Sequence, residues 1–192
     1  DMLPQRKLVE MLKHYAKAYF CEVASFCVMG NHYHVVLRFE EPGPVSPEEL
    51  LRRAKRLYPK SGKLLKAWSK EQWERFRVRL FDLSELMRNL QAAFARWYNR
   101  AHERRGRFWA ERFKSTLLED GEAVLDCMLY VDLNPVRAGL VQRPEDYDGS
   151  SCFLRHAKAD RWMLKLTDLV GGGARKQAMR EYRALLYHRG NV

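Results

Sequence analysis

The sequence contains few cysteines and no long apolar segment. Its cysteines are Cys21, Cys27, Cys127 and Cys152, and no two of them form a Cys-x-x-Cys pair. This spacing argues against a zinc site and a disulfide framework, so we expect reduced and mostly buried thiols. No apolar run reaches the roughly 18 residues of a membrane span, and no charged-then-apolar leader opens the chain. We therefore expect a cytoplasmic protein with no membrane partner.

Acidic residues are scarce in one third of the sequence. Residues 51–115 carry 19 Lys and Arg against 6 Asp and Glu, a balance of +13, whereas all other residues carry 16 against 18, a balance of −2. The formal net charge of +11 therefore originates in this segment. Such a bias indicates a phosphate-contacting surface and a polyanionic partner. An acidic protein partner would produce the same bias and stays open.

A phosphate-binding glycine loop and internal repeats are also absent. Gly171-Gly172-Gly173 follows no predicted strand and precedes no Lys-Ser or Lys-Thr pair, so we interpret it as a hinge. A connector rich in proline and glycine spans residues 40–47 and separates an N-terminal segment from the basic region.

Two histidines lie at the start of a predicted strand. Residues 20–29 and 32–39 have the pattern of two antiparallel strands joined across Gly30-Asn31. Alternate side chains of a strand share a face, about 6.6 Å apart, so His32 and His34 lie on one face and Tyr33 on the other. Two imidazoles at this spacing can bind one divalent cation. Two hydrogen-bonded histidines on a sheet face are the alternative.

Helices are predicted on both sides of this hairpin. Apolar periodicity predicts a helix at about residues 4–18, and a helix start at 46–49 opens a basic region that is helical in pieces, with a break near 59–62. Asp82 is expected to cap a helix whose apolar stripe includes Tyr98, which we interpret as a core residue. A short strand is predicted at 113–118, and further helices at about 160–170 and 174–187.

Asp120 is expected to cap another helix, at about residues 121–133, in which nearly every position is apolar. Against that background Asp126, Tyr130 and Asn134 stand at i, i+4 and i+8 and form one polar stripe. Polar groups on a buried helix need partners or a function. Pro135 follows, so we expect Asn134 where the helix ends or is distorted.

Arginines alternate with aromatic residues in the segment Arg104-Arg105-Gly106-Arg107-Phe108-Trp109. This pattern suits single-stranded nucleic acid, because bases stack on aromatic rings and cations contact phosphates. A buried Trp109 is the alternative interpretation. The candidate nucleic-acid-binding residues are Arg100, Arg104, Arg105, Arg107, Trp109, Arg112 and Lys114.

Four motifs occur together: Met29-Gly30-Asn31-His32-Tyr33-His34, Trp97-Tyr98-Asn99-Arg100, Gly106-Arg107-Phe108-Trp109-Ala110-Glu111-Arg112-Phe113-Lys114-Ser115 and Tyr130-Val131-Asp132-Leu133-Asn134-Pro135-Val136-Arg137-Ala138-Gly139-Leu140-Val141. Through them the chain resembles the single-tyrosine HUH transposases, in particular the REP-associated tyrosine transposases. HUH denotes two histidines that flank a bulky hydrophobic residue, here Tyr33. The resemblance runs from about residue 8 to residue 141 and only weakly covers 41–79 and the tail.

The resemblance implies an α+β fold of the ferredoxin-like (RRM-like) type, an antiparallel sheet with helices packed on one face. That domain would span residues 1–145 with a basic helical insertion at about 41–80, and residues 146–192 would form a C-terminal helical extension. The family's fold begins with a strand before the first helix. We do not find that strand here, so we expect the sheet to lack a strand beside the hairpin.

The resemblance also implies roles for single residues. His32, His34 and Asn134 would bind Mg²⁺ or Mn²⁺, and Tyr130 would be the nucleophile that forms a 5′-phosphotyrosine intermediate. Asp126, on the same stripe, is a candidate for orienting Tyr130. The implied activity is that of a metal-dependent single-stranded DNA nuclease and strand transferase.

Two alternatives stay open beside this activity. A non-catalytic module on the same fold could bind RNA or DNA hairpins, and a replication initiator of the HUH type would usually need further domains, for which 192 residues are too few. The expected partner is single-stranded DNA with hairpin structure, which would place the protein at the nucleoid of a prokaryote. Both a monomer and a dimer fit the sequence.

Overall fold

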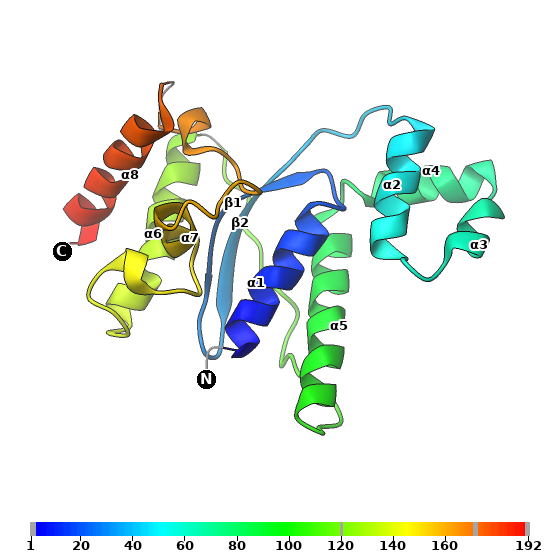
Figure 1. Ribbon diagram of the computed structural model, residues 1–192, viewed down its shortest axis with the longest axis horizontal. Coiled ribbons are helices and arrows are strands. Elements are labelled where there is room, and N and C mark those ends of the chain that lie inside the picture. The colour runs from blue at the N-terminus through cyan, green and yellow to red at the C-terminus, as the bar shows by residue number, and fades with distance from the viewer. Residues whose placement is uncertain (1–2, 120, 171–172, 191–192) are drawn as a thin grey trace. The chain divides into compact units, whose positions relative to one another are not determined.

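The protein has an α+β fold with a two-stranded antiparallel sheet and several helices (Figure 1). The computed structural model describes residues 3–119, 121–170 and 173–190. These residues form two compact units, the first from the described parts of 1–9, 22–38 and 114–192, the second from 10–21 and 39–113. Residues after 146 lie in the first unit, so the predicted boundary near 145 coincides with no boundary between units.

The predicted hairpin is confirmed as β1 (Cys21–Val28) and β2 (Tyr33–Phe39). The Met29 N–H donates to the His32 carbonyl at 2.8 Å and closes the turn, so His32 lies just before β2. β1 is almost wholly buried and also forms backbone hydrogen bonds with downstream residues. The Val28 N–H donates to the Gly149 carbonyl, and the Leu164 N–H donates to the Val23 carbonyl, both at 2.9 Å.

The strand predicted at residues 113–118 is absent, and this prediction was wrong. Residues 113–119 have no regular secondary structure, and the Leu117 side chain is 87% exposed. Within the described residues β2 pairs with β1 alone, so no third strand provides a ladder for this segment.

The core of the first unit places a helix over the histidine face of the sheet. α6 (Gly121–Arg137) contributes Met128 and Leu129 to a buried cluster that also contains Val36 of β2. Val36 lies two residues after His34 and therefore shares its face. α8 (Arg175–Gly190) closes the same cluster with Ala178, Tyr182 and Leu186.

The tail contains less regular helix than its sequence predicts. A helix at 174–187 is confirmed as α8, but the helix predicted at 160–170 is absent apart from the 3-10 turn η2 (Leu166–Asp168). The backbone of this segment binds the sheet instead, through Leu164 and Val23. Between α6 and this segment lie the 3-10 turn η1 (Pro144–Asp146) and α7 (Ser151–His156). Gly171 and Gly172 lie outside the described residues.

The second unit is helical and basic. It contains α2 (Pro47–Leu57), α3 (Gly62–Lys66), α4 (Lys70–Arg79), α5 (Leu83–Ala101) and the part of α1 (Leu3–Ala16) from Glu10 onward. The helix start predicted at 46–49 and the Asp82 cap are confirmed, because the side chain of Ser46 accepts from the Glu49 N–H at 3.2 Å and that of Asp82 from the Ser84 N–H at 2.6 Å. Cys21, Cys27 and Cys152 are buried, and Cys127 is half-buried.

Candidate functional site

The two histidines of the hairpin lie against each other as predicted. The ring centroids of His32 and His34 are 5.1 Å apart with planes at 79°. His32 Nδ1 lies 2.7 Å from Asn31 Oδ1, and because a carbonyl oxygen only accepts, Nδ1 carries the proton. This leaves Nε2 of His32 with its lone pair available to a metal ion.

His34 is held in the neutral form. Partial burial lowers its pKa, and the charge of His32 lowers it further. Neutral imidazole is the form that binds metal ions, so burial at the edge of the core favours a ligand role for this residue.

Tyr130 of α6 lies beside His34. The two ring centroids are 5.9 Å apart at an interplanar angle of 81°, and half of the Tyr130 surface is exposed. The guanidinium carbon of Arg137, two turns further along α6, lies 5.0 Å from the Tyr130 ring centroid. The phenol is therefore open to an incoming substrate and has a cation next to it.

Asn134 lies within α6, which continues to Arg137, so of the two expected outcomes the helix end at Asn134 was wrong. Pro135 has no N–H for the carbonyl of Val131, and the Asn134 side chain compensates. Its Nδ2 donates to the Tyr130 carbonyl at 2.8 Å and approaches the Val131 carbonyl at 3.5 Å. With the amide nitrogen engaged on the helix backbone, Oδ1 is left as the free donor atom, the one a divalent cation would bind.

The polar stripe of α6 is not buried, since Tyr130 is exposed and Asp126 and Asn134 are half-buried. The Asp126 carboxylate is 45% exposed and forms an ion pair with Arg189 of α8 at 2.5 Å. No bond from Asp126 to Tyr130 occurs within the described residues. Asp120, the expected cap of α6, lies outside them.

Two imidazoles and one amide oxygen are therefore the candidate metal donors. Among the described residues no cluster of three or more His, Cys, Asp or Glu could hold a metal ion. His32 and His34 lie next to each other and Tyr130 next to His34, and Asn134 follows one turn later on the same side of α6. This donor set fits an ion such as Mg²⁺ or Mn²⁺ that keeps part of its coordination shell for water and phosphate.

Sequence reasoning missed the residue that fixes α6 in the core. Asp132 is fully buried, and its carboxylate accepts from Ser25 of β1 at 3.2 Å, from Ser151 of α7 at 2.5 Å and from Tyr182 of α8 at 2.7 Å. Burial raises its pKa despite these hydrogen bonds. An acidic residue within an otherwise apolar run was the available signal.

Trp109, one of the predicted nucleic-acid-binding residues, belongs to an aromatic cluster of the second unit. Trp109 is half-buried, its indole N–H donates to the Gln91 carbonyl at 2.9 Å, and its ring packs on Phe94 and Phe108. Arg104 lies 5.8 Å from the Tyr98 ring centroid. The exposed cations of the predicted set are Arg100, Arg104, Arg105, Arg107, Arg112 and, in the first unit, Lys114.

Comparisons with protein-family models, with curated proteins and with solved structures found no match to this chain.

Proposed function

We propose that the protein is a metal-dependent nuclease and strand transferase for single-stranded DNA, with Tyr130 as its nucleophile. The observation that carries this proposal is the position of a half-exposed phenol 5.9 Å from the ring of His34, itself paired with His32. A nucleophile beside a pair of side chains that can bind a metal ion suits metal-assisted phosphoryl transfer through a covalent intermediate.

His32, His34 and Asn134 would hold the divalent cation. Their neutral donors carry no charge that opposes phosphate, so the bound ion would supply Lewis acidity toward a phosphate oxygen. The residues of this chain do the positioning. Asn31 fixes the tautomer of His32, and the backbone contacts of Asn134 direct its amide oxygen away from the helix.

The reaction exchanges one phosphodiester for another. Tyr130 Oη, having lost its proton to water, bonds to phosphorus, and the bond from phosphorus to the 3′ oxygen of the preceding nucleotide breaks. That oxygen takes up a proton and leaves as a 3′-OH, and the 5′ phosphate remains on the tyrosine. Because the new linkage is again a phosphodiester, a 3′-OH of another strand can reverse the reaction and rejoin DNA. Arg137 would stabilise the charge of the phosphate and of the phenolate.

The proposed fold is ferredoxin-like, with α6 covering the histidine face of the β1–β2 hairpin. The basic second unit would hold the substrate, since its exposed arginines flank an aromatic cluster that suits unpaired bases. Hairpin-containing DNA, part duplex and part single strand, is the substrate proposed here.

The test is trapping of the covalent intermediate. The protein is incubated with single-stranded DNA hairpins and Mn²⁺, and adducts are separated under denaturing conditions and mapped by peptide mass spectrometry. We expect one adduct, on Tyr130, that EDTA prevents. An adduct on another residue, or none with any hairpin that the protein binds, would contradict the proposal.

A hairpin-binding module without catalysis is the second candidate. It is favoured because no cluster of three or more His, Cys, Asp or Glu that could hold a metal ion occurs in the part of the chain that the structure describes, and two histidines with one amide bind a metal ion only modestly. If the protein binds DNA hairpins without forming an adduct, and His34→Ala leaves the affinity for the hairpin unchanged, this second function is supported instead.

A further inference from the structure

The tail of the protein carries a second basic surface that the overall charge distribution conceals. Residues 151–192 contain 9 Lys and Arg against 3 Asp and Glu, whereas residues 1–50 and 116–150 together contain 7 against 15. Summed together, these two groups give a nearly neutral balance. In the structure six of these nine cations line one hollow.

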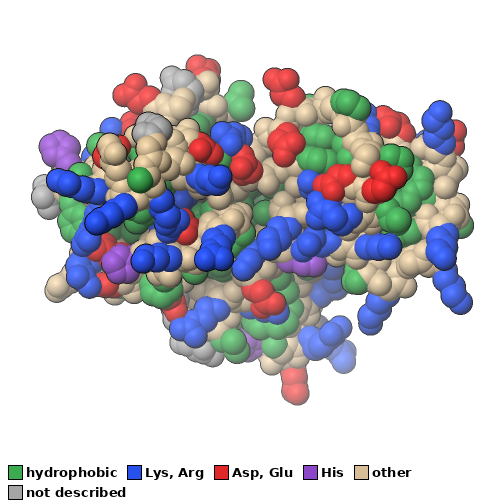
Figure 2. All heavy atoms as spheres, turned by 45° about the horizontal axis from the view of Figure 1, so that its top comes forward, with side chains coloured by type: hydrophobic (Ala, Val, Ile, Leu, Met, Phe, Trp, Pro, Cys, Tyr) green, Lys and Arg blue, Asp and Glu red, His purple; other side chains and the backbone are tan. Residues whose placement is uncertain are grey.

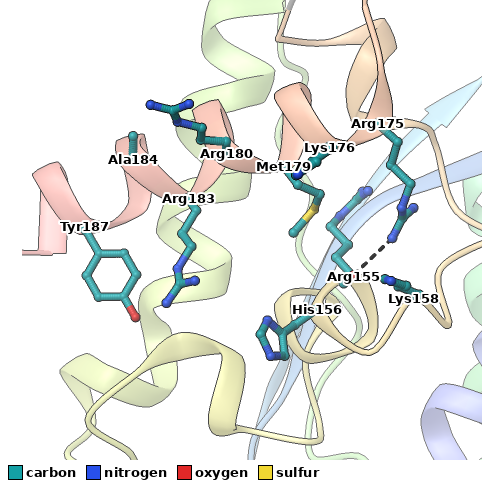
Figure 3. Close-up of a pocket in the computed structure, with 10 residues that line it drawn as sticks. All are labelled: Arg155, His156, Lys158, Arg175, Lys176, Met179, Arg180, Arg183, Ala184 and Tyr187. Atoms are coloured by element: carbon teal, nitrogen blue, oxygen red, sulfur yellow. Dashed lines mark hydrogen bonds between the residues drawn. The ribbon is translucent and has the colours of Figure 1, made fainter.

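This hollow, of about 880 Å³, lies between α7, the residues that follow it, and α8 (Figure 3). We call it the α7–α8 groove. In Figure 3 Arg183 and Tyr187 extend from α8 toward α7 and η1, while His156 and Lys158 border the opposite side. In Figure 2 blue Lys and Arg side chains are dense on the left, over the part of the face that α7 and α8 occupy. The Lys and Arg residues that line the groove are Arg155, Lys158, Arg175, Lys176, Arg180 and Arg183.

Only part of this charge is neutralised by the protein. Asp160, 5% exposed, binds Arg175 at 2.8 Å and lies 3.5 Å from Arg155, and Glu145, also 5% exposed, binds Arg183 at 2.8 Å. Six cations against two buried carboxylates leave a balance of +4. No ion pair of Lys158, Lys176 or Arg180 occurs within the described residues. The groove is therefore complementary to a polyanion.

The floor of the groove is fixed in place. Arg155 is 1% exposed, and its Nη2 donates to the carbonyl of Ala24 on β1 at 2.7 Å, whereas its Nε and Nη1 make no hydrogen bond within the described residues. Arg175 Nη2 donates to the Arg155 carbonyl at 3.0 Å. Because this guanidinium is buried and faces Asp160, it contributes fixed positive charge to the floor, and only the exposed cations of the groove are accessible to an anion.

We propose that the α7–α8 groove binds the phosphodiester backbone of double-stranded DNA. Cations that lie around a hollow contact phosphates, and phosphate contacts position a duplex without reading its sequence. A single strand is disfavoured because it needs exposed aromatic rings for stacking. Two rings line the groove, Tyr187 and the exposed imidazole of His156. Tyr187 is engaged, since its hydroxyl donates to Glu145 at 2.9 Å and the guanidinium carbon of Arg183 lies 5.3 Å from its ring centroid. A lone imidazole is a smaller stacking surface than the successive rings on which a single strand binds. If the proposed function holds, this duplex is the stem of the substrate hairpin.

The test compares two double variants of equal charge. Lys158→Gln/Lys176→Gln removes two exposed cations of the groove, and Arg161→Gln/Lys165→Gln removes two exposed cations of the same unit that do not line it. Binding of a short blunt-ended duplex is measured by fluorescence anisotropy at several salt concentrations. For the groove variant we expect the slope of log K against log salt to become shallower by about 2, since each phosphate contact contributes about 1. For the control variant we expect a slope close to that of the unaltered protein.

Three outcomes would overturn this proposal. The first is an unchanged salt slope in the groove variant. The second is an equal loss of duplex affinity in both variants. The third is a loss of affinity for single-stranded oligonucleotides that is as large as the loss of affinity for the duplex. Tighter binding of polyglutamate than of the duplex at the same salt concentration, lost in the groove variant, would assign the groove to an acidic protein instead. A stem-free oligonucleotide separates this test from the nuclease proposal, because its adduct with Tyr130 should form equally in both variants. Absence of that adduct in all proteins would contradict the nuclease proposal alone.

Discussion

Tyr182 of α8 donates a hydrogen bond from its hydroxyl to Asp132 of α6 at 2.7 Å, and both side chains are almost completely buried. With Ser25 and Ser151 on the other carboxylate oxygen, this bond ties the sheet, α7 and α8 to one point of α6. Asp132 lies between Tyr130 and Asn134, on the opposite side of the helix. Its contacts therefore set the rotation of α6 that presents Tyr130 to His34.

Removing the Asp132 carboxylate should destabilise the protein strongly. Asp132→Ala leaves buried hydroxyl donors without an acceptor, and we expect a loss of about 3 kcal/mol in the free energy of unfolding, measured with urea. Asp126→Ala, on the exposed face of the same helix, is the matched control and should cost less than about 1 kcal/mol. Equal costs for both changes would show that Asp132 does not fix α6.

The same residue should make stability depend on pH. Burial raises the pKa of Asp132, so the folded protein holds this proton more tightly than the unfolded chain does. The contribution of this group is largest at acidic pH and decreases as pH rises above the ordinary aspartate pKa near 4. Asp132→Asn cannot titrate and should flatten the decrease, even though it lowers stability overall. The free energy of unfolding is measured with urea across this pH range. If Asp132→Asn shows the same pH dependence as the unaltered protein, Asp132 is not its source.

Tyr130→Phe should abolish the covalent adduct while folding and hairpin binding persist, because one exposed oxygen atom is lost and little volume changes. Tyr98→Phe is the control, since Tyr98 packs against Phe94, Phe108 and His102 in the second unit. We expect this variant to keep most of the activity. An adduct that survives Tyr130→Phe would show that the nucleophile lies elsewhere.

Metal binding should depend on the hairpin and on its turn. His32→Ala and His34→Ala should each prevent the adduct as EDTA does, whereas hairpin binding should largely remain. Asn31→Ala should weaken Mn²⁺ binding by about 10- to 100-fold, because it removes the acceptor that fixes the tautomer of His32. Calorimetric titration with Mn²⁺ measures these effects, and His14→Ala, an exposed histidine of the second unit, is the control. Full adduct formation by His34→Ala in excess EDTA would exclude the site.

Binding of single-stranded DNA should weaken steeply with salt. If the segment 51–115 makes roughly 5–8 phosphate contacts, the slope of log K against log salt should be about −4 to −6. A flat response would remove the basic surface of the second unit from the binding site.

Lys158→Gly should stabilise the protein and weaken duplex binding together. Lys158 has φ +56°, a left-handed conformation that glycine adopts without strain, so we expect a gain of about 0.5–1 kcal/mol in the free energy of unfolding. Glu103→Gly, at φ +52°, is the matched control and should stabilise without making duplex binding less salt-dependent. A variant that is more stable yet binds duplex with an unchanged salt slope would exclude Lys158 from the groove.

The sequence by itself determined the local features of the candidate site. Gly30-Asn31 specifies the hairpin turn, strand periodicity puts His32 and His34 on one face, and helical periodicity puts Tyr130 and Asn134 on one side of α6. Side-chain caps likewise fixed the starts of α2 and α5, since both partners of each cap lie within three residues. These features need no information beyond neighbouring residues.

Tertiary structure decided which side of α6 faces the core. Asp126 and Asp132 are both acidic residues in an apolar run, yet one pairs with Arg189 at the surface and the other is buried. The partners of Asp132 lie 107, 19 and 50 residues away in sequence, at Ser25, Ser151 and Tyr182, so no local pattern signals them. The same holds for the α7–α8 groove, whose cations lie up to 28 residues apart, between Arg155 and Arg183, and come together only when the two helices pack. Local periodicity does not distinguish between the possible orientations of these helices. Long-range packing, which depends on the shape of the whole core, selects one of them.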